Sequence, residues 1–136
     1  MNVSQTRKLA FVAVPHSTEF RRICGSIEHA LGAYDYDVQR LGHREPSNLV
    51  PDLVHQVQMS DLLVAVLTGS RPNVFFELGA AFGAGVPSIM VAQSLADLGM
   101  LSGEANVIIY GDQPEQIERR VRDWVEHRRA MEGSAK

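Results

Sequence analysis

The sequence is poor in cysteine and has no excess of one charge. Cys24 is the only cysteine among 136 residues, so an internal disulfide is excluded and no second thiol can complete a zinc site. The 13 basic and 16 acidic residues give a formal net charge of −3, without a run of one sign, which argues against binding to polymeric nucleic acid. We therefore expect a protein of a reducing, cytoplasmic compartment that holds no metal and no cofactor.

Long hydrophobic runs are also missing. The stretch from Met1 to Leu9 lacks the apolar core of a signal peptide. The longest stretch of low charge, Leu78 to Ala92, is shorter than the ~20 residues that span a bilayer, and Pro87 interrupts it. We expect no membrane partner. At ~150 residues per domain, the length predicts one domain, over residues 1–131, with a frayed tail at 132–136.

Short apolar runs alternate with helical patterns along the chain. Five runs are typical of strands in a sheet covered on both faces: 9–14, 36–41, 62–67, 88–92 and 107–110. Helical periodicity fills the segments between them and follows the last one, at about 20–32, 47–59, 73–84 and from 112 onward. Right-handed crossovers then predict an α/β, flavodoxin-like three-layer sandwich with a five-stranded parallel sheet in the order 2-1-3-4-5.

The last helix has the clearest pattern. Asp112 is expected to cap it, because Pro114 and Glu115 follow at the spacing of a helix start. Ile117, Val121, Trp124 and Val125 share one face of this helix, and we expect all four side chains to be buried against the sheet.

In this strand order, the loops that leave the first and third strands line the ligand-binding crevice. These loops are Pro15–Thr18 and Thr68–Asn73, and Glu77 lies near the start of the helix that follows the second loop. The helix dipole should keep Glu77 ionised. An ionised carboxylate beside a crevice can attack an anomeric carbon or stabilise an oxocarbenium-like transition state. Alternatively, Glu77 has no chemical role and only complements the dipole of its helix at a solvated surface.

The segment 68–79 reads TGSRPNVFFELG, after the apolar strand 62–67. Together with FVAVP at 11–15 and GVPSIMV at 85–91, it resembles the nucleoside 2-deoxyribosyltransferase family and its TIR-like relatives. The resemblance implies one such domain over residues 1–131. It also implies that Glu77 acts as nucleophile on C1′ of a nucleoside or nucleotide, so that the protein is a deoxyribosyltransferase or an N-ribohydrolase.

Two positions depart from the pattern of that family. Val66 stands where an aspartate is frequent, and Val14-Pro15-His16 stands where Met-Pro-Phe is frequent. These departures leave open a different substrate, a hydrolase in place of a transferase, or a TIR-like nucleotide-binding or interaction module without turnover.

A departing nucleobase needs a proton donor. Asp61 precedes its strand and would lie ~23 Å from the active edge, which excludes it. Asp52 follows the second strand and is our candidate, although an acid in the first turns of a helix commonly complements the dipole.

Six residues of the two crevice loops are candidates for substrate contacts: Pro15, His16, Ser17, Thr68, Gly69 and Asn73. His16 could bind a phosphate or a base, and the Ser17 hydroxyl could lie beside free N–H groups at a helix start. Ser17 can also be a plain N-cap, and Asn73 is either a helix cap or a substrate contact.

Small residues gather in the third helix at 79, 80, 83 and 84. Glycine destabilises a helix interior relative to alanine, so Gly79 and Gly83 indicate close approach of a neighbour, either the sheet or a second subunit. Phe75 and Phe76 are expected to be exposed beside them. Since the resembled family forms homo-oligomers, we expect a dimer or a higher oligomer.

Overall fold

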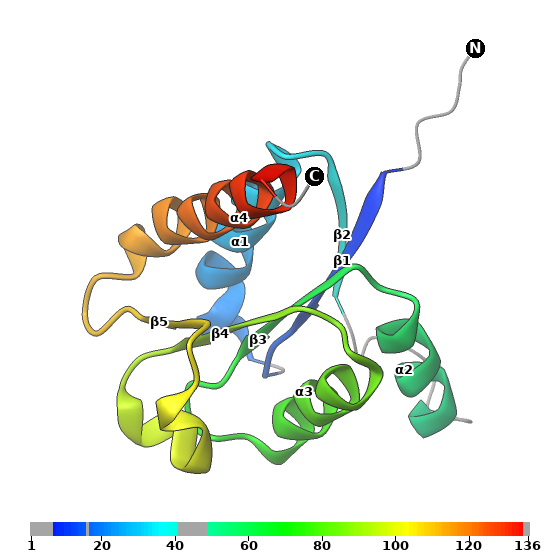
Figure 1. The fold of residues 1–136 in the computed structure, drawn as a ribbon. Coiled ribbons are helices and arrows are strands. Elements are labelled where there is room, and N and C mark those ends of the chain that lie inside the picture. Colours follow the sequence, from blue (N-terminus) through cyan, green and yellow to red (C-terminus); the bar gives the residue numbers. More distant parts are fainter. Residues whose placement is uncertain (1–6, 16, 41–48, 135–136) are drawn as a thin grey trace.

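The computed structural model describes residues 7–15, 17–40 and 49–134 (Figure 1). Its sheet has five strands: β1 (Lys8–Ala13), β2 (Tyr36–Arg40), β3 (Leu62–Val66), β4 (Ser88–Ala92) and β5 (Val107–Ile109). Every neighbouring pair is parallel, and the order is β2-β1-β3-β4-β5. The predicted sheet and its strand order are therefore confirmed.

Helices cover both faces of the sheet (Figure 1). On one face lie α1 (Arg21–Gly32) and α4 (Ile117–Ser134), and on the other lie α2 (Leu49–Gln58) and α3 (Pro72–Ala84). Three 3₁₀ segments complete the described chain: η1 (Thr18–Phe20), η2 (Leu95–Gly103) and η3 (Pro114–Gln116). The result is the expected three-layer α/β sandwich.

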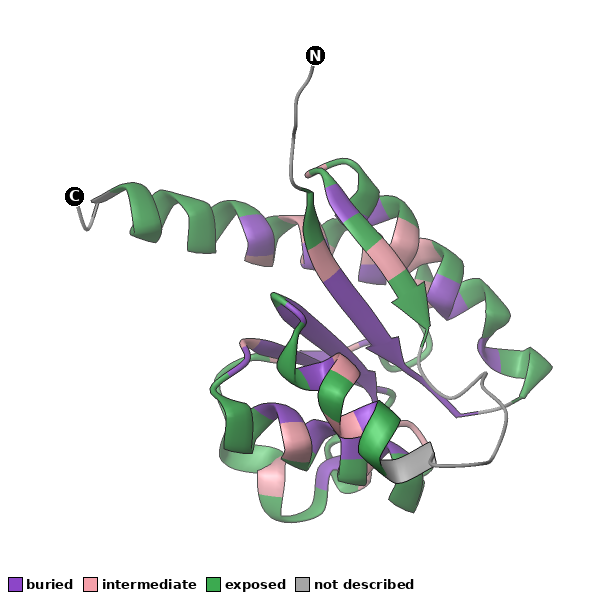
Figure 2. Ribbon diagram, turned by 90° about the vertical axis from the view of Figure 1, so that its right-hand side faces the viewer, coloured by how far each residue is buried: buried purple, intermediate pink, exposed green. Residues whose placement is uncertain are grey.

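The core divides into two layers because successive strand residues point to opposite faces. Val12 and Val64 face α1 and α4, whereas Phe11, Leu63 and Ala65 face α2 and α3. Figure 2 shows the central strands mostly buried and the outer faces of the helices mostly exposed, and only the first two residues of β1 are not buried. All five residues of β3 are buried, which explains why its sequence is continuously apolar and does not alternate.

The predicted cap of the last helix is wrong. The chain turns at Tyr110–Gln113, where the Gln113 N–H donates to the Tyr110 carbonyl at 2.8 Å and Gly111 has a φ of 58°. This turn places Asp112 ahead of the helix start. The short helix η3 then begins at Pro114, with Gln113 as its N-cap and no capping side-chain hydrogen bond, and α4 itself begins at Ile117.

The buried stripe of α4 is confirmed at Ile117, Val121 and Val125 but not at Trp124, which is only partly buried. The Trp124 indole Nε1–H donates to Asn106 Oδ1 at 3.3 Å, and the Arg128 guanidinium lies 5.6 Å from the ring centroid. The indole thus needs a polar partner at the edge of the core, which keeps one side of the ring at the surface.

The last helix also continues past residue 131, where we expected the domain to end. Arg128 Nε and Glu132 Oε2 are 3.1 Å apart, an i,i+4 ion pair that supports the final turns up to Ser134. Within residues 7–15, 17–40 and 49–134, no helix is both long enough and apolar enough to cross a membrane.

The packing of α4 leads to a first prediction. Ile117 is fully buried, so Ile117→Ala should lower the free energy of unfolding by about 2–5 kcal/mol through lost burial and a residual cavity. Met131→Ala, at an exposed position of the same helix, should change it by less than about 0.5 kcal/mol. Urea unfolding of both variants measures the difference, and equal stabilities would contradict the assigned face of α4.

Candidate functional site

The two crevice loops meet at the carboxyl edge of the sheet. β1 and β3 are parallel neighbours, with Ala13 opposite Ala65, so the loops that follow them leave the sheet side by side. Pro15 and Ser17 belong to the first loop. Thr68 and Gly69 belong to the second, and Asn73 to the helix start after it. His16 lies outside the described residues.

Glu77 occupies a position on α3 that normally belongs to the core. Val74, Glu77, Leu78 and Ala81 are the buried residues of this helix, at the i, i+3, i+4, i+7 spacing of a face that packs on the sheet. The Glu77 side chain is 4% exposed. It makes no hydrogen bond or ion pair with the residues that the structure describes. A carboxyl group therefore lies on the buried face of α3 without a polar partner among the described residues.

Burial raises the pKa of Glu77 to about 7, from an ordinary value of 4.5. The expectation that the helix dipole keeps this group ionised is therefore wrong. Glu77 lies in the second turn of α3, which begins at Pro72, and the dipole acts mainly within the first turn. Desolvation of the carboxylate outweighs the dipole. Near pH 7 both the protonated and the ionised form of Glu77 are populated.

The loop between β3 and α3 is held in an unusual shape. Gly69 and Ser70 have φ values of 83° and 52°, in the left-handed region. The Gly69 N–H donates to Asp97 Oδ1 at 3.2 Å, and the Ser70 hydroxyl donates to the Asp97 carbonyl at 2.9 Å. Asp97 on η2 thus fixes the loop. Because the Gly69 N–H already donates to Asp97, the backbone group of Gly69 that remains for a ligand is its carbonyl.

Asp97 was missed by reasoning from the sequence. Its other carboxylate oxygen accepts a hydrogen bond from the Ser94 N–H at 3.1 Å, and the Ser94 side chain completes a capping box. The Ser-x-x-Asp spacing could have indicated the start of η2. The contact to Gly69 joins residues 28 apart in the sequence, so spacing does not predict it.

Tyr110 is a second residue that the sequence did not single out. It follows β5, is buried, and its hydroxyl lies 2.7 Å from Thr68 Oγ1. The two hydroxyls tie the loop after β3 to the end of β5, across β4. Thr68 is thereby held on one side by Tyr110, while Asp97 holds Gly69 and Ser70.

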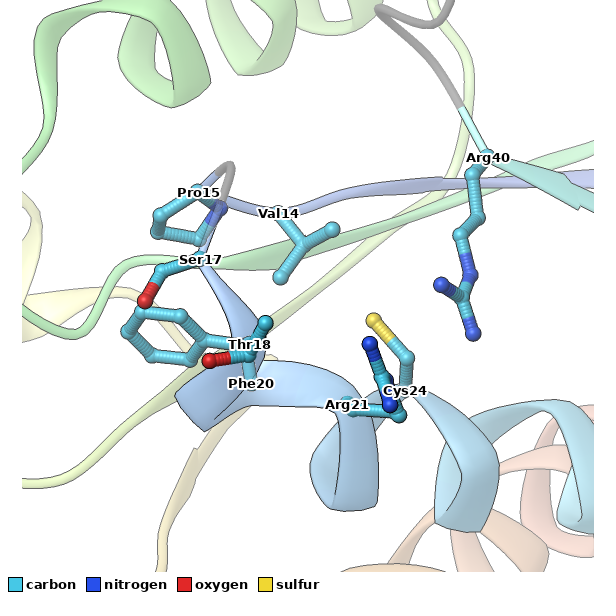
Figure 3. Close-up of a pocket in the computed structure, with 8 residues that line it drawn as sticks. All are labelled: Val14, Pro15, Ser17, Thr18, Phe20, Arg21, Cys24 and Arg40. Carbon is cyan, nitrogen blue, oxygen red and sulfur yellow. The ribbon is translucent and has the colours of Figure 1, made fainter.

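Pro15 and Ser17 line a cavity of about 340 Å³ at the start of α1 (Figure 3). Ser17 is the N-cap of η1, and its hydroxyl oxygen accepts the Glu19 N–H at 3.4 Å. The capping role considered for Ser17 is therefore present, although the hydroxyl hydrogen remains available to a ligand. Arg21 and Arg40 line the same cavity.

The two remaining candidates are exposed. Asn73 is the second residue of α3, whose N-cap is Arg71, so the helix-cap interpretation of Asn73 is wrong and the side chain is free to contact a ligand. Asp52 lies in the first turn of α2, which packs beside α3 on the same face of the sheet. It makes no hydrogen bond or ion pair within the described chain.

A second hollow, of about 530 Å³, lies between α3 and η2. Its lining is mostly apolar and includes Phe75, Phe82 and Met100. Phe75 was expected to be exposed but is partly buried against the core, whereas Phe76 is exposed. Across the described residues 7–15, 17–40 and 49–134, no group of three or more His, Cys, Asp or Glu side chains could hold a metal ion.

The burial of Glu77 predicts a pH-dependent stability. Between pH 4.5 and about 7 the folded state keeps a proton that the unfolded chain releases, so the wild type loses stability as the pH rises. Glu77→Gln removes this titration. The free energy of unfolding of Glu77→Gln, relative to wild type, should therefore increase by up to about 3 kcal/mol between pH 4.5 and pH 8.

Urea unfolding across this pH range measures the effect. Glu19→Gln, at an exposed position, controls for the loss of one formal charge. A constant difference between wild type and Glu77→Gln at all pH values would contradict the raised pKa.

Comparison with known proteins identifies the fold of this chain. No protein-family model and no curated protein sequence matches it. The structure of a Clostridium botulinum CMP N-glycosidase, BcmB, superimposes with a TM-score of 0.62 at 17% identity, over 82% of this chain and 96% of that one.

A fungal multi-domain GH3 β-N-acetylglucosaminidase with a GCN5-related glucosamine N-acetyltransferase region superimposes with a TM-score of 0.60 at 16% identity. The match covers 90% of this chain but only 14% of that protein, so this chain corresponds to a small part of it. At these identities, both similarities establish the three-layer fold alone.

Proposed function

We propose that the protein cleaves or transfers the N-glycosidic bond of a nucleoside or nucleotide, with Glu77 as the nucleophile at C1′. The observation that carries this proposal is the buried carboxyl group of Glu77, 4% exposed and without a polar partner among the described residues. Carboxyl groups with strongly raised pKa values gather at functional sites, because burial without a partner lowers stability. The similar fold of a CMP N-glycosidase, over nearly its whole length, supports the same chemistry.

The first step forms a covalent intermediate. An oxygen of the ionised Glu77 carboxylate bonds to C1′ while the bond from C1′ to the base nitrogen breaks. The electron pair of that bond stays on the base, which takes up a proton. We propose Asp52 as the donor of this proton.

The second step returns the enzyme to its starting state. Water attacks C1′ and gives up a proton to Asp52, the ester bond to Glu77 breaks, and both the Glu77 carboxylate and the proton donor are restored. If a second nucleobase attacks in place of water, the same intermediate yields base exchange. Hydrolysis and transfer thus differ in the acceptor and not in the role of Glu77.

Residues of the two crevice loops complete the proposed site. We propose that Thr68, whose hydroxyl pairs with that of Tyr110, and the Gly69 carbonyl form hydrogen bonds with sugar hydroxyls. Asn73 offers an exposed amide at the start of the helix that carries Glu77. Pro15, His16 and Ser17 are the proposed contacts from the loop after β1.

Glu77→Gln tests the nucleophile directly. Glutamine has the same size but no anionic oxygen, so base release should fall at least about a thousandfold, or about 4 kcal/mol of transition-state stabilisation. The measurement is chromatography of free base from nucleosides, nucleoside monophosphates and NAD. Asp52→Asn should also slow release, because Asp52 is the proposed proton donor. Glu115→Gln, at an exposed position of η3, serves as a matched control.

Two outcomes would contradict the proposal. Equal base release by wild type and Glu77→Gln would remove Glu77 from the mechanism. An absence of release by the wild type, across the substrate panel, would favour the TIR-like nucleotide-binding or interaction module without turnover.

We further propose that the protein forms a homo-oligomer through the outer face of α3. The exposed residues of this helix carry no charge, and they include Phe76, Phe82 and Gly83. A Cβ atom added at Gly79 or Gly83 would meet nothing within 4 Å in the described chain, so close approach of the sheet does not explain these glycines. Met100 on η2 is 95% exposed. An uncharged face with room for close helix approach suits a second copy of the chain.

Light scattering at micromolar concentration should therefore give at least twice the protomer mass of 15.0 kDa. Phe82→Glu should shift the mass toward the protomer, because it would place a charge in the proposed interface. Met131→Glu, an equivalent change on exposed α4, should leave the mass unchanged. A wild-type mass of one protomer would contradict this proposal.

A further inference from the structure

The cavity at the start of α1 is lined by two arginines that have no role in the proposed function so far. Its volume is about 340 Å³, at the lower end of the range for small-ligand pockets. Its polar lining consists of Ser17, which is the N-cap of η1, Thr18 of η1, Arg21 of α1 and Arg40 of β2. Figure 3 shows Arg40 extending from β2 toward Cys24 and Arg21 on α1.

The two arginines are incompletely neutralised. Arg40 Nε donates to Glu28 Oε2 at 2.8 Å, but the two terminal nitrogens of Arg40 have no hydrogen-bond partner among the described residues. Arg21 has neither a hydrogen bond nor an ion pair within the described chain. None of the described residues that line the cavity is acidic. Two guanidinium groups with free donors therefore meet in one cavity of a protein whose formal net charge is −3.

Hydroxyl groups add neutral donors on the η1 side of the cavity. The Ser17 oxygen accepts the Glu19 N–H and so keeps its own hydrogen for a ligand, and Thr18 makes no side-chain hydrogen bond to a described residue. Arginine forks together with hydroxyls match the oxygens of a phosphate monoester, since guanidinium binds phosphate through paired N–H groups.

We propose that this cavity binds the phosphate of a nucleoside 5′-monophosphate whose N-glycosidic bond lies at Glu77. This inference rests on the proposed function and narrows its substrate class from nucleosides and nucleotides to monophosphates. Arg21 and Arg40 become the residues that recognise the phosphate, and the loop after β1, with Pro15 and Ser17, lies between them and the crevice.

The order of the strands makes this arrangement possible. β1 lies between β2, which carries Arg40, and β3, which leads to the helix that carries Glu77. Neighbouring strands are separated by ~4.8 Å, so the ends of β2 and β3 are ~10 Å apart. In a nucleoside 5′-monophosphate, the sugar separates the phosphate from C1′. A ligand of this shape can extend from the Arg21–Arg40 cavity across the end of β1 toward Glu77.

The test uses Glu77→Gln, in which turnover is removed, and titration calorimetry with matched ligand pairs. CMP and AMP should each bind at least about tenfold tighter than cytidine and adenosine, respectively. Adding Arg21→Gln or Arg40→Gln should weaken monophosphate binding about tenfold and leave nucleoside binding unchanged. Arg22→Gln is the control, because Arg22 is exposed on the same helix turn but does not line the cavity.

Further variants and ligands separate phosphate recognition from folding. Arg40→Lys keeps a positive charge beside Glu28 but loses the planar guanidinium group. This variant should retain the melting temperature and still bind CMP more weakly than the protein that keeps Arg40. Inorganic phosphate should bind more weakly than CMP. Equal affinity for inorganic phosphate and CMP would show a free-phosphate site and overturn the assignment to a nucleotide.

These experiments distinguish a failure of the proposed phosphate site from a failure of the proposed reaction. A lack of any phosphate advantage in both ligand pairs, or an equal effect of Arg22→Gln and Arg21→Gln, would overturn the phosphate site. Tight CMP binding through Arg21 and Arg40 without base release by the wild type would overturn the proposed reaction but support the cavity. Equal base release from cytidine and CMP, unaffected by Arg21→Gln, would overturn the cavity and leave the reaction standing.

Discussion

A parallel sheet with both faces covered needs strands that are apolar on both sides, and this requirement shapes the whole chain. β3 satisfies it most completely, since all five of its residues are buried. Because every strand runs in the same direction, every loop at the carboxyl edge opens to one side of the molecule. The ends of β1, β2 and β3 therefore lie side by side at this edge, although they come from distant parts of the sequence.

Two features of this edge lower stability. Glu77 places a carboxyl group on the face of α3 that packs on the sheet, and Ser70, which is not a glycine, adopts a left-handed backbone conformation. The surrounding structure maintains the second feature through hydrogen bonds from Gly69 and Ser70 to Asp97. Strained loops and buried charges that persist in this way are typical of functional sites. Glu77 and the loop before it therefore indicate the same candidate site, at the carboxyl edge of the sheet.

Reasoning from the sequence succeeded where a pattern repeats locally. The apolar runs predicted the five strands, and the helical spacing of Ile117, Val121 and Val125 predicted the buried face of α4. It failed where a residue far away in the sequence forms a hydrogen bond with the side chain in question. Trp124 stays partly exposed because Asn106 accepts its N–H. The prediction for Asp112 failed for a local reason, because this residue lies within the turn Tyr110–Gln113, ahead of the N-cap Gln113. The dipole argument for Glu77 failed because sequence alone does not measure desolvation.

The sequence by itself determined the order of strands and helices along the chain and the two loops that follow β1 and β3, because hydrophobic periodicity is a property of neighbouring residues. A short motif also predicted Glu77 as a site residue. Only the tertiary structure decided the environment of these residues. Four features depend on contacts between separate segments: the burial of Glu77, the hydrogen bond between Thr68 and Tyr110, the hydrogen bond from Gly69 to Asp97, and the cavity that Arg21 and Arg40 both line. Such contacts depend on how the sheet brings its loops together, and no local pattern in the sequence encodes the distances between those loops.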